Sequence, residues 1–373
     1  MKRKILIILG TRPEAIKFAP LIKTLRHEEQ SFDVAVCNTG QHLEMTNQVL
    51  EYFSIVPDYS LNVMRQGQTL TSLSQMLLGA LDKVIDDFGP DLIFVQGDTT
   101  TTFIGALAGF YKQVKIAHLE AGLRSNDRFS PFPEEVNRTL TGHIADFHFA
   151  VTKRNELALH NENINNGIYV VGNTGIDTLH LCLDKVRSEE ELYTKRYSFI
   201  EPDKRMILMT GHRRESFGQP FVDIFNAIGH IEDTFKDTQF IYPVHLNPNV
   251  RAKAFEMLEG KERIHLLEPV DYPDMLWLMS KSYFIVTDSG GIQEEAPSLG
   301  KPLIVTRDVT ERVEGVDCGT ALLAGTERNK LEELMTSLLT NNELYNKMSV
   351  AENPYGDGST SQRIASILKE NLF

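Results

Sequence analysis

Three carboxylates and one histidine stand where they could do general acid–base chemistry. Asp98 and Glu120 each follow a short apolar run, Glu134 comes directly after a proline, and the second half of the chain has His212 after another apolar run. Carboxylates and imidazoles are the side chains that most often transfer protons in enzymes. A single acid is usually a solvated residue. Asp98 could also merely cap the next helix, and Glu134 could be an acid in the first turn of a helix after Pro133. Glu120 is harder to explain so, because the residues before it are apolar. If the four groups converge, they predict acid–base catalysis.

Two cationic side chains accompany a helix start near the N-terminus. Gly10 suits a tight turn, and Pro13 suits the first turn of a helix, where a missing N–H costs nothing. Free amides at a helix start, together with Arg12 and Lys17, favour an anionic ligand. A well-formed helix start without a ligand explains the same residues equally well.

The segment after Asp288 has the residues of a phosphate-binding turn. Ser289 is suited to cap the next helix, while Gly290 and Gly291 let phosphate oxygens approach backbone amides. Glu294 and Glu295 then fall in the first turn or two. Acids there are favourable near a helix N-terminus in any protein, and alternatively one of them holds the hydroxyls of a ribose. The combination favours a nucleotide, but neither a Gly-x-Gly-x-x-Gly nor a Walker motif occurs, which disfavours NAD and P-loop chemistry.

Short apolar runs alternate with longer amphipathic stretches along the chain. Several runs are apolar throughout, as in parallel strands covered on both faces, so the alternation predicts doubly wound α/β sheets. The expected strands are Ile5–Leu9, Val34–Cys37, Leu92–Val95, Lys115–His118, Phe147–Val151, Tyr169–Val171, Met206–Met209, Phe240–Tyr242, Ile264–Leu267, Phe284–Val286 and Leu303–Val305. The expected helices include Ala15–Leu25, Leu70–Asp87, Phe103–Tyr111 and Pro220–Phe235. Ligands bind beyond the carboxyl ends of such strands, and polar segments follow strand after strand, which predicts a ligand cleft between two sheets.

The alternation breaks once, in the charged segment Val186–Lys204. A chain of 373 residues favours two domains, and a new strand follows this segment at once. We therefore expect an N-terminal domain over 1–185 and a C-terminal domain over 186–357, although a solvated helix would explain the charges as well. The end of the chain has an amphipathic stretch, Ser361–Leu368, which predicts a tail helix packed back on one of the halves.

Composition limits the classes of partner and cofactor. Hydrophobic residues make up 42% and charged residues 24%, as in ordinary globular proteins, and 38 basic against 51 acidic residues give a net charge of −13. Nucleic acids and anionic membranes need a basic surface, so we expect neither as a partner. The three cysteines form no CxxC pair and no His-x-x-x-His motif occurs, so no metal is expected. The sequence has neither a signal-peptide core nor a membrane-length apolar run, which predicts a cytoplasmic protein.

Taken together, these motifs resemble those of bacterial non-hydrolysing UDP-N-acetylglucosamine 2-epimerases. They occur in order over essentially the whole chain. The matching segments are Gly10–Lys17, Gly97–Thr101, His118–Arg124, Pro133–Glu135, Gly211–Glu215, Thr287–Glu295, Thr310–Arg312 and Asn353–Gly358. The resemblance implies the glycosyltransferase-B architecture, with two Rossmann-like domains, an active site in the interdomain cleft and a C-terminal helix, about 358–373, that returns to the first domain. It also implies a homodimer that needs no metal or other cofactor.

The resemblance assigns roles residue by residue. Asp98, Glu120, Glu134 and His212 match the catalytic positions. Substrate-binding positions fall on Arg12, Lys17, Ser289, Gly290, Gly291, Glu295 and Arg312, with the two glycines and Ser289 at the phosphates and Glu295 at the ribose. The substrate is UDP-N-acetylglucosamine, which is converted into UDP-N-acetylmannosamine for cell-surface polysaccharide synthesis. In some family members a second UDP-N-acetylglucosamine activates the enzyme, and Gln41, Gln68, Glu135 and His245 match that allosteric site.

The chain departs from the family pattern near its uracil site and in one loop. Val270 and Met275 replace the Gln and Phe of other members, which predicts backbone rather than side-chain contacts to uracil, and Val313 replaces a usual Pro. Three other function classes suit parts of the sequence. A glycosyltransferase would need an acceptor, a regulatory binding protein would not need the acids, and a hydrolysing epimerase would release free N-acetylmannosamine.

Overall fold

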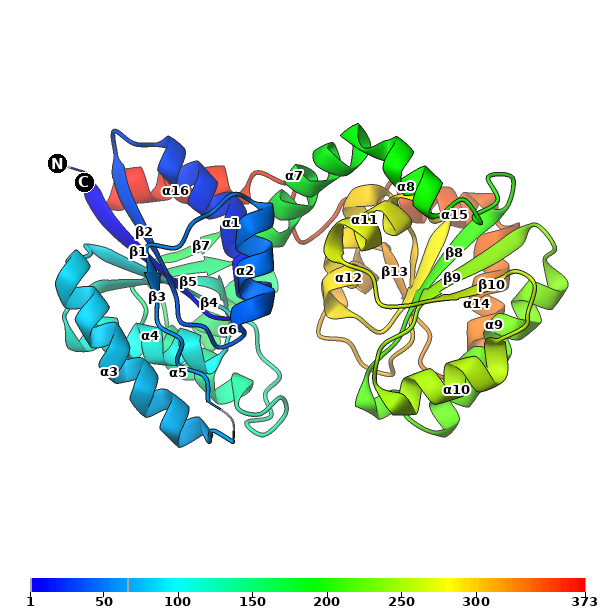
Figure 1. Ribbon diagram of the computed structural model, residues 1–373, viewed down its shortest axis with the longest axis horizontal. Helices are drawn as coiled ribbons and strands as arrows, with labels where there is room; N and C mark the ends of the chain where they lie inside the picture. The colour runs from blue at the N-terminus through cyan, green and yellow to red at the C-terminus, as the bar shows by residue number, and fades with distance from the viewer. Residues whose placement is uncertain (1, 66, 373) are drawn as a thin grey trace. The chain divides into compact units, whose positions relative to one another are not determined.

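The computed structural model describes residues 2–65 and 67–372, and the chain divides into two compact units (Figure 1). Met1–Thr178 together with Tyr355–Phe373 form the first unit, and Leu179–Pro354 form the second. The division falls inside helix α7 (Thr174–Ser188), so a continuous helix carries the chain out of the first unit. No helix among the described residues is long and apolar enough to cross a membrane.

The first unit is built on a seven-stranded parallel sheet with the order β3-β2-β1-β4-β5-β6-β7. Its strands are β1 (Arg3–Leu9), β2 (Phe32–Asn38), β3 (Tyr59–Ser60), β4 (Leu92–Gln96), β5 (Lys115–Ala121), β6 (Phe147–Ala150) and β7 (Ile168–Val170). Successive residues of β1 point to opposite faces of the sheet, and Ile5 to Leu9 are all buried. This burial on both faces explains why the strand is apolar throughout rather than alternating.

Helices cover both faces of this sheet. Helix α3 packs on α4, and α4 packs on α5, whereas α1 packs on α2 and on the C-terminal helix α16. The helices are α1 (Arg12–His27), α2 (Leu43–Tyr52), α3 (Leu70–Phe88), α4 (Thr100–Tyr111), α5 (Glu134–Ile144), α6 (Lys153–Asn161) and α16 (Thr360–Leu372). The buried carboxylate of Asp177 accepts hydrogen bonds from the amides of Thr360 and Ser361 at the start of α16, at 3.3 and 2.7 Å. These contacts fasten the tail helix to the first unit.

The second unit repeats the pattern with a six-stranded parallel sheet of order β10-β9-β8-β11-β12-β13. Its strands are β8 (Arg205–Thr210), β9 (Thr238–Pro243), β10 (Ile264–Leu267), β11 (Phe284–Thr287), β12 (Leu303–Val305) and β13 (Ala321–Leu323). The α-helices are α8 (Glu190–Arg196), α9 (Gln219–Thr234), α10 (Pro248–Leu258), α11 (Tyr272–Lys281), α12 (Gly290–Glu295), α13 (Val313–Asp317), α14 (Arg328–Thr340) and α15 (Asn342–Ser349). Phe221, Phe225 and Ile228 of α9 pack on Ile207 and other strand residues to form its core.

All eleven predicted strands are present, and two further edge strands, β3 and β13, were not predicted. Strand β3 has only two residues, which is too short for a hydrophobic pattern to stand out, whereas β13 has three apolar residues, as many as the predicted β12. The charged segment Val186–Lys204 is largely helical, since α7 continues to Ser188 and α8 follows. Its charged side chains therefore lie on solvated faces of helices, which was the alternative explanation of the charges.

Candidate active site

The loop between β1 and α1 is organised by a buried carboxylate, Glu14, which is 1% exposed. One of its oxygens accepts hydrogen bonds from the amides of Gly10 and Thr11, both at 2.7 Å, and the other accepts from the Thr99 hydroxyl at 2.5 Å. Glu14 therefore already satisfies these two amides, so they are not free for an anion. Arg12 is partly exposed and has no ion-pair partner in the part of the chain that the structure describes.

Glu120 lies at the carboxyl end of β5 in an unusual backbone conformation. Its φ is +63°, and the pairing of β5 with β6 shifts register between Leu119 and Ala121. A side chain in the left-handed region costs on the order of 1–3 kcal/mol and is concentrated at functional sites. The bulge turns the Glu120 carboxylate toward Lys17, whose Nζ lies 2.6 Å from Oε1, while the Gln96 amide donates to Oε2. Lys17 was predicted as a cation for an anionic ligand and Glu120 as a catalytic acid, and the structure joins the two as an ion pair.

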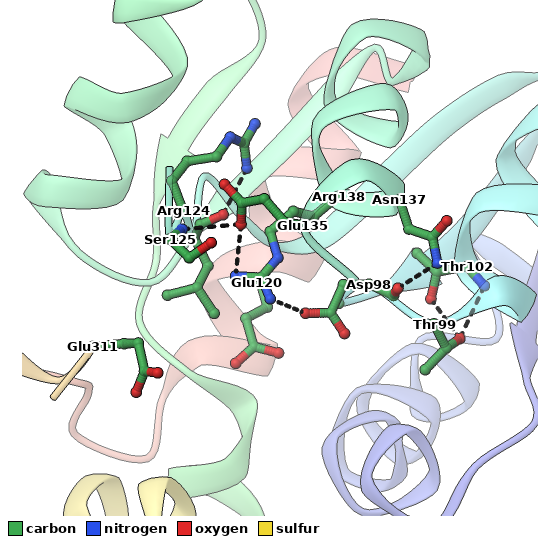
Figure 2. Close-up of polar contacts among 12 residues, drawn as sticks. Asp98, Thr99, Thr102, Glu120, Arg124, Ser125, Glu135, Asn137, Arg138 and Glu311 are labelled. Carbon is green, nitrogen blue, oxygen red and sulfur yellow. Dashed lines mark hydrogen bonds and ion pairs between the residues drawn. The ribbon is translucent and has the colours of Figure 1, made fainter. Parts of the chain in front are cut away.

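Asp98 stands two residues beyond β4 and is held by α5 (Figure 2). The Asn137 side chain donates to the Asp98 carbonyl at 2.9 Å, and the Arg138 guanidinium lies 2.7 Å from the Asp98 carboxylate. Burial raises the pKa of Asp98 to about 6, since the opposing effect of Arg138 is smaller and Glu120 and Glu134 raise it further. A carboxyl group that titrates near neutral pH is suited to transfer protons.

The predicted catalytic acids of the first unit therefore converge. Glu120 and Glu134 both act electrostatically on Asp98, and Lys17 does so with the opposite sign. Glu134 is the first residue of α5, and its Oε2 is buried with no hydrogen-bond partner among the described residues. Asp98 is not a helix cap, because Thr99 caps α4 by accepting from the Thr102 amide at 3.1 Å. The structure thus disfavours the capping explanation for Asp98 and leaves a carboxylate oxygen of Glu134 available.

The proposed allosteric residues of the first unit have protein partners. Gln41 accepts a hydrogen bond from the Thr101 hydroxyl at 2.8 Å, and the Gln68 amide donates to the Val63 carbonyl at 3.1 Å. Glu135 is 5% exposed, and its two oxygens each accept a backbone amide, from Ser125 and Asn126, at 2.9 Å. Glu135 thus fastens the loop that follows β5.

His212 in the second unit is oriented by a buried acid. Asp288 is fully buried, its Oδ1 lies 3.1 Å from Nδ1 of His212, and its Oδ2 accepts the amides of His212 and Arg213 at 2.7 and 2.8 Å. Burial alone would raise the Asp288 pKa, but the contact with His212 and the two amides lowers it below its ordinary value. The His212 ring stacks on exposed His245 with centroids 5.5 Å apart, so these two predicted residues are neighbours.

Ser289 occupies the N-cap position of α12, but its hydroxyl makes no capping hydrogen bond, so the predicted cap is wrong. The Arg312 guanidinium covers Gly290, where an added Cβ would lie 3.2 Å from its Cζ. Glu294 holds that guanidinium at 2.8 Å. Arg312 and the turn Ser289–Gly291 are therefore brought together, which provides a cation beside backbone amides and suits an anion.

The two acids of α12 separate into different roles. Glu294 is buried and pairs with Arg312, whereas Glu295 is partly exposed and accepts from the Tyr272 hydroxyl at 3.2 Å. Of the two alternatives for the ribose, the structure thus leaves Glu295 the more accessible. Nearby, Glu311 pairs with buried Arg307 at 2.8 Å, and although burial opposes it, this contact lowers the Glu311 pKa to about 2.

Sequence reasoning missed the residues that hold the others in place. They are Glu14, Gln96, Arg138, Asp288 and Arg307, and Glu294 was predicted only as a possible ribose ligand. Asp288 directly follows an apolar strand, as Glu120 nearly does, and this position was a usable signal. Arg138 gave none, since a lone arginine in a helix is ordinarily a surface residue.

Comparisons with known proteins agree over the full length. A family model described as UDP-N-acetylglucosamine 2-epimerase matches residues 24–369. The UDP-N-acetylglucosamine 2-epimerase of Escherichia coli (strain K12) is 49% identical over 372 residues, 99% of each chain. The structure of UDP-GlcNAc 2-epimerase from Neisseria meningitidis bound to UDP-GlcNAc has a TM-score of 0.91 and 43% identity, over 99% of this chain and 100% of that one. The S. aureus MnaA–UDP structure has a TM-score of 0.87 and 45% identity, over 99% and 97%. These similarities confirm the predicted α/β fold with two Rossmann-like units of the glycosyltransferase-B type.

Proposed function

The chain belongs to the UDP-N-acetylglucosamine 2-epimerase family of isomerases, and from this premise we propose that it interconverts UDP-N-acetylglucosamine and UDP-N-acetylmannosamine without net hydrolysis. The observation that carries the proposal is that Asp98 and Glu120 stand at the carboxyl ends of the neighbouring strands β4 and β5, and that helix α5, which Glu134 begins, holds Asp98. Epimerisation has to remove a proton from one face of carbon 2 and return one to the other, which requires more than one acid–base group.

We propose an elimination followed by a re-addition. The bond between carbon 1 and the UDP oxygen breaks with its electron pair on UDP, and the proton on carbon 2 passes to a carboxylate. The products are 2-acetamidoglucal and UDP. The UDP oxygen then attacks carbon 1 again while a second group protonates carbon 2 from the opposite face. The proton on carbon 2 is not acidic in the sugar itself, so lengthening of the bond at carbon 1 is what makes its removal feasible.

The proposed division of roles follows the two units. In the first, Asp98, Glu120 and Glu134 act on the sugar, and Lys17 and Arg12 supply positive charge. In the second, Ser289, Gly290 and Gly291 hold the diphosphate beside Arg312, Glu295 holds the ribose, and His212 stabilises the leaving group. Two observations support this assignment. The Arg312 guanidinium packs over Gly290, and the Ser289 hydroxyl makes no capping hydrogen bond. The amides of Gly10 and Thr11 do not take part, because Glu14 holds them.

Incubation with UDP-N-acetylglucosamine alone tests the function directly. We expect the anomeric ¹H NMR signals to reach a mixture of two UDP-sugars with little free sugar, and in D₂O we expect deuterium to enter carbon 2. Deuterium enters because the proton that is returned need not be the one removed. Accumulation of free N-acetylmannosamine would identify a hydrolysing enzyme instead. An unchanged substrate that reacts only after an acceptor is added would identify a glycosyltransferase.

We further propose a homodimer that a second UDP-N-acetylglucosamine activates through Gln41, Gln68, Glu135 and His245, for a pathway of cell-surface polysaccharide synthesis. Glu135 would contribute through the loop whose amides it holds. We expect a sigmoidal dependence of the forward rate on substrate, and a reverse reaction that stalls unless some UDP-N-acetylglucosamine is added. A hyperbolic forward curve with a freely running reverse reaction would contradict the activation.

A further inference from the structure

Arg138 is a buried cation that lies between two carboxylates of the first unit. Its side chain is 7% exposed, its Nη2 lies 2.7 Å from Asp98 Oδ2, and its Nη1 lies 3.5 Å from Glu135 Oε2 (Figure 2). Burial of an unpaired guanidinium would be very unfavourable, and the two carboxylates offset that cost. The charge of Arg138 is therefore directed at Asp98 rather than at solvent.

Two consecutive residues of α5 fix Asp98 at two points. Asn137 holds the Asp98 carbonyl at 2.9 Å, and Arg138 holds its carboxylate. The other end of the guanidinium is fixed in turn, because Glu135 lies one helical turn before it and is itself held by the amides of Ser125 and Asn126. A rigid second contact of this kind restricts a reacting carboxyl group to one orientation.

The other charged groups that face Asp98 come from three elements. Glu120 at the end of β5 and Glu134 at the start of α5 are negative, and Lys17 of α1 is positive. Burial and the two acids favour the neutral form of Asp98, whereas Arg138 is the strongest influence in favour of the charged form, ahead of Lys17. Loss of Arg138 would leave Asp98 buried beside two acids with only the weaker cation.

We propose that Arg138 is a positioning residue for the epimerisation, which orients the Asp98 carboxyl group and sets the pH range in which that group changes charge. This inference rests on the proposed function of Asp98. Arg138 itself makes no contact with the reacting atoms in this proposal.

The pH dependence of kcat/KM for Arg138→Met tests the proposal. In the unchanged protein we expect kcat/KM to rise or fall around pH 6, and we call this part of the pH profile the limb. If the residual activity of Asp98→Asn lacks the limb, the limb is assigned to Asp98. An opposite charge at this distance lowers a carboxyl pKa by about 1–3 units, so Arg138→Met should move the limb upward by about that much. The direction is the same whether Asp98 reacts as the acid or as the base. The rate at the new optimum should also fall, because the carboxyl group is no longer oriented.

Two other substitutions separate this effect from a general loss of structure. Arg138→Lys keeps the charge and should return the limb most of the way toward its original position. Arg263→Met removes a comparably buried arginine of the second unit, whose side chain is 9% exposed and pairs with Glu232 at 2.9 Å. It should lower the melting temperature without moving the limb. Glu135→Gln should move the limb downward, because Arg138 then has Asp98 as its only anionic partner among the residues described.

An Arg138→Met protein that is slower but keeps the limb where it was would overturn the proposal and leave Arg138 a structural residue. If Arg138→Met does not fold, an unmoved limb in Glu135→Gln would have the same meaning. Failure of the unchanged protein to interconvert the two UDP-sugars would instead contradict the proposed function, so the two failures are distinguishable.

Discussion

Glu120→Gln should lower kcat by about 10²–10⁴ while the affinity for UDP stays nearly unchanged. The substitution keeps the size of the side chain and removes its charge and its capacity to take up a proton, and groups of this kind typically contribute a factor in that range. It also leaves the ammonium group of Lys17, 2.6 Å from Oε1, without its anionic partner at this position. UDP binding is assigned to the second unit, so equilibrium titration with UDP should separate it from turnover.

A matched control is Glu156→Gln in α6 of the same unit. Glu156 pairs with Lys153 at 3.0 Å at the surface, and exposed pairs contribute only about 0–1 kcal/mol. The control should keep the turnover and the melting temperature of the unchanged protein. Near-normal turnover in Glu120→Gln would remove Glu120 from the catalytic set, and its left-handed backbone would then need another explanation.

The fold was predictable because its strands are buried on both faces. Such strands must be apolar at every position, as Ile5–Leu9 is, so they stand out from the amphipathic helices between them. Strand β3 could not be predicted, since Tyr59–Ser60 is too short to have a pattern of its own, whereas the apolar Ala321–Leu323 of β13 is as long as the predicted β12 and was a usable signal. The charged segment Val186–Lys204 was predicted to mark the boundary between two domains, because a solvated helix has no apolar face wide enough to reveal it.

The candidate site was predictable to the extent that its residues follow strands in sequence. Glu120 is an example, but its positive φ and its contact with Lys17, 103 residues away, depend on the tertiary structure. Glu14 illustrates the opposite error. Its spacing from Gly10 and Thr11 is that of a capping interaction, and this local carboxylate satisfies amides beside a helix start where an anion was one of two predicted explanations. Long-range partners such as Arg138 for Asp98 leave no periodic trace in one sequence.

His212→Asn and Asp288→Asn should each lower kcat by about 10²–10⁴, because we expect the two residues to act as one unit. Asp288 Oδ1 lies 3.1 Å from Nδ1 of His212, and Oδ2 fixes the backbone beside the ring through the amides of His212 and Arg213. An asparagine would place an amide where a carboxylate now faces Nδ1, and the ring could then no longer keep the same tautomer and orientation. Without the oriented imidazole, the departing diphosphate loses a stabilising donor.

The double substitution distinguishes this coupling from two independent losses. If Asp288 acts through His212, the variant with both changes should be about as slow as the slower single variant, since residues that act together are not additive. His230→Asn is the control, because His230 is an exposed histidine of the same unit that lies 3.8 Å from Glu332, and it should keep full turnover. The single-turnover rate with UDP-N-acetylglucosamine is measured for each variant. If the rate reductions of the two single variants multiply in the double variant, Asp288 contributes to the reaction by a route other than His212. Its remaining contact for such a route is the hydrogen bond from the Arg213 amide.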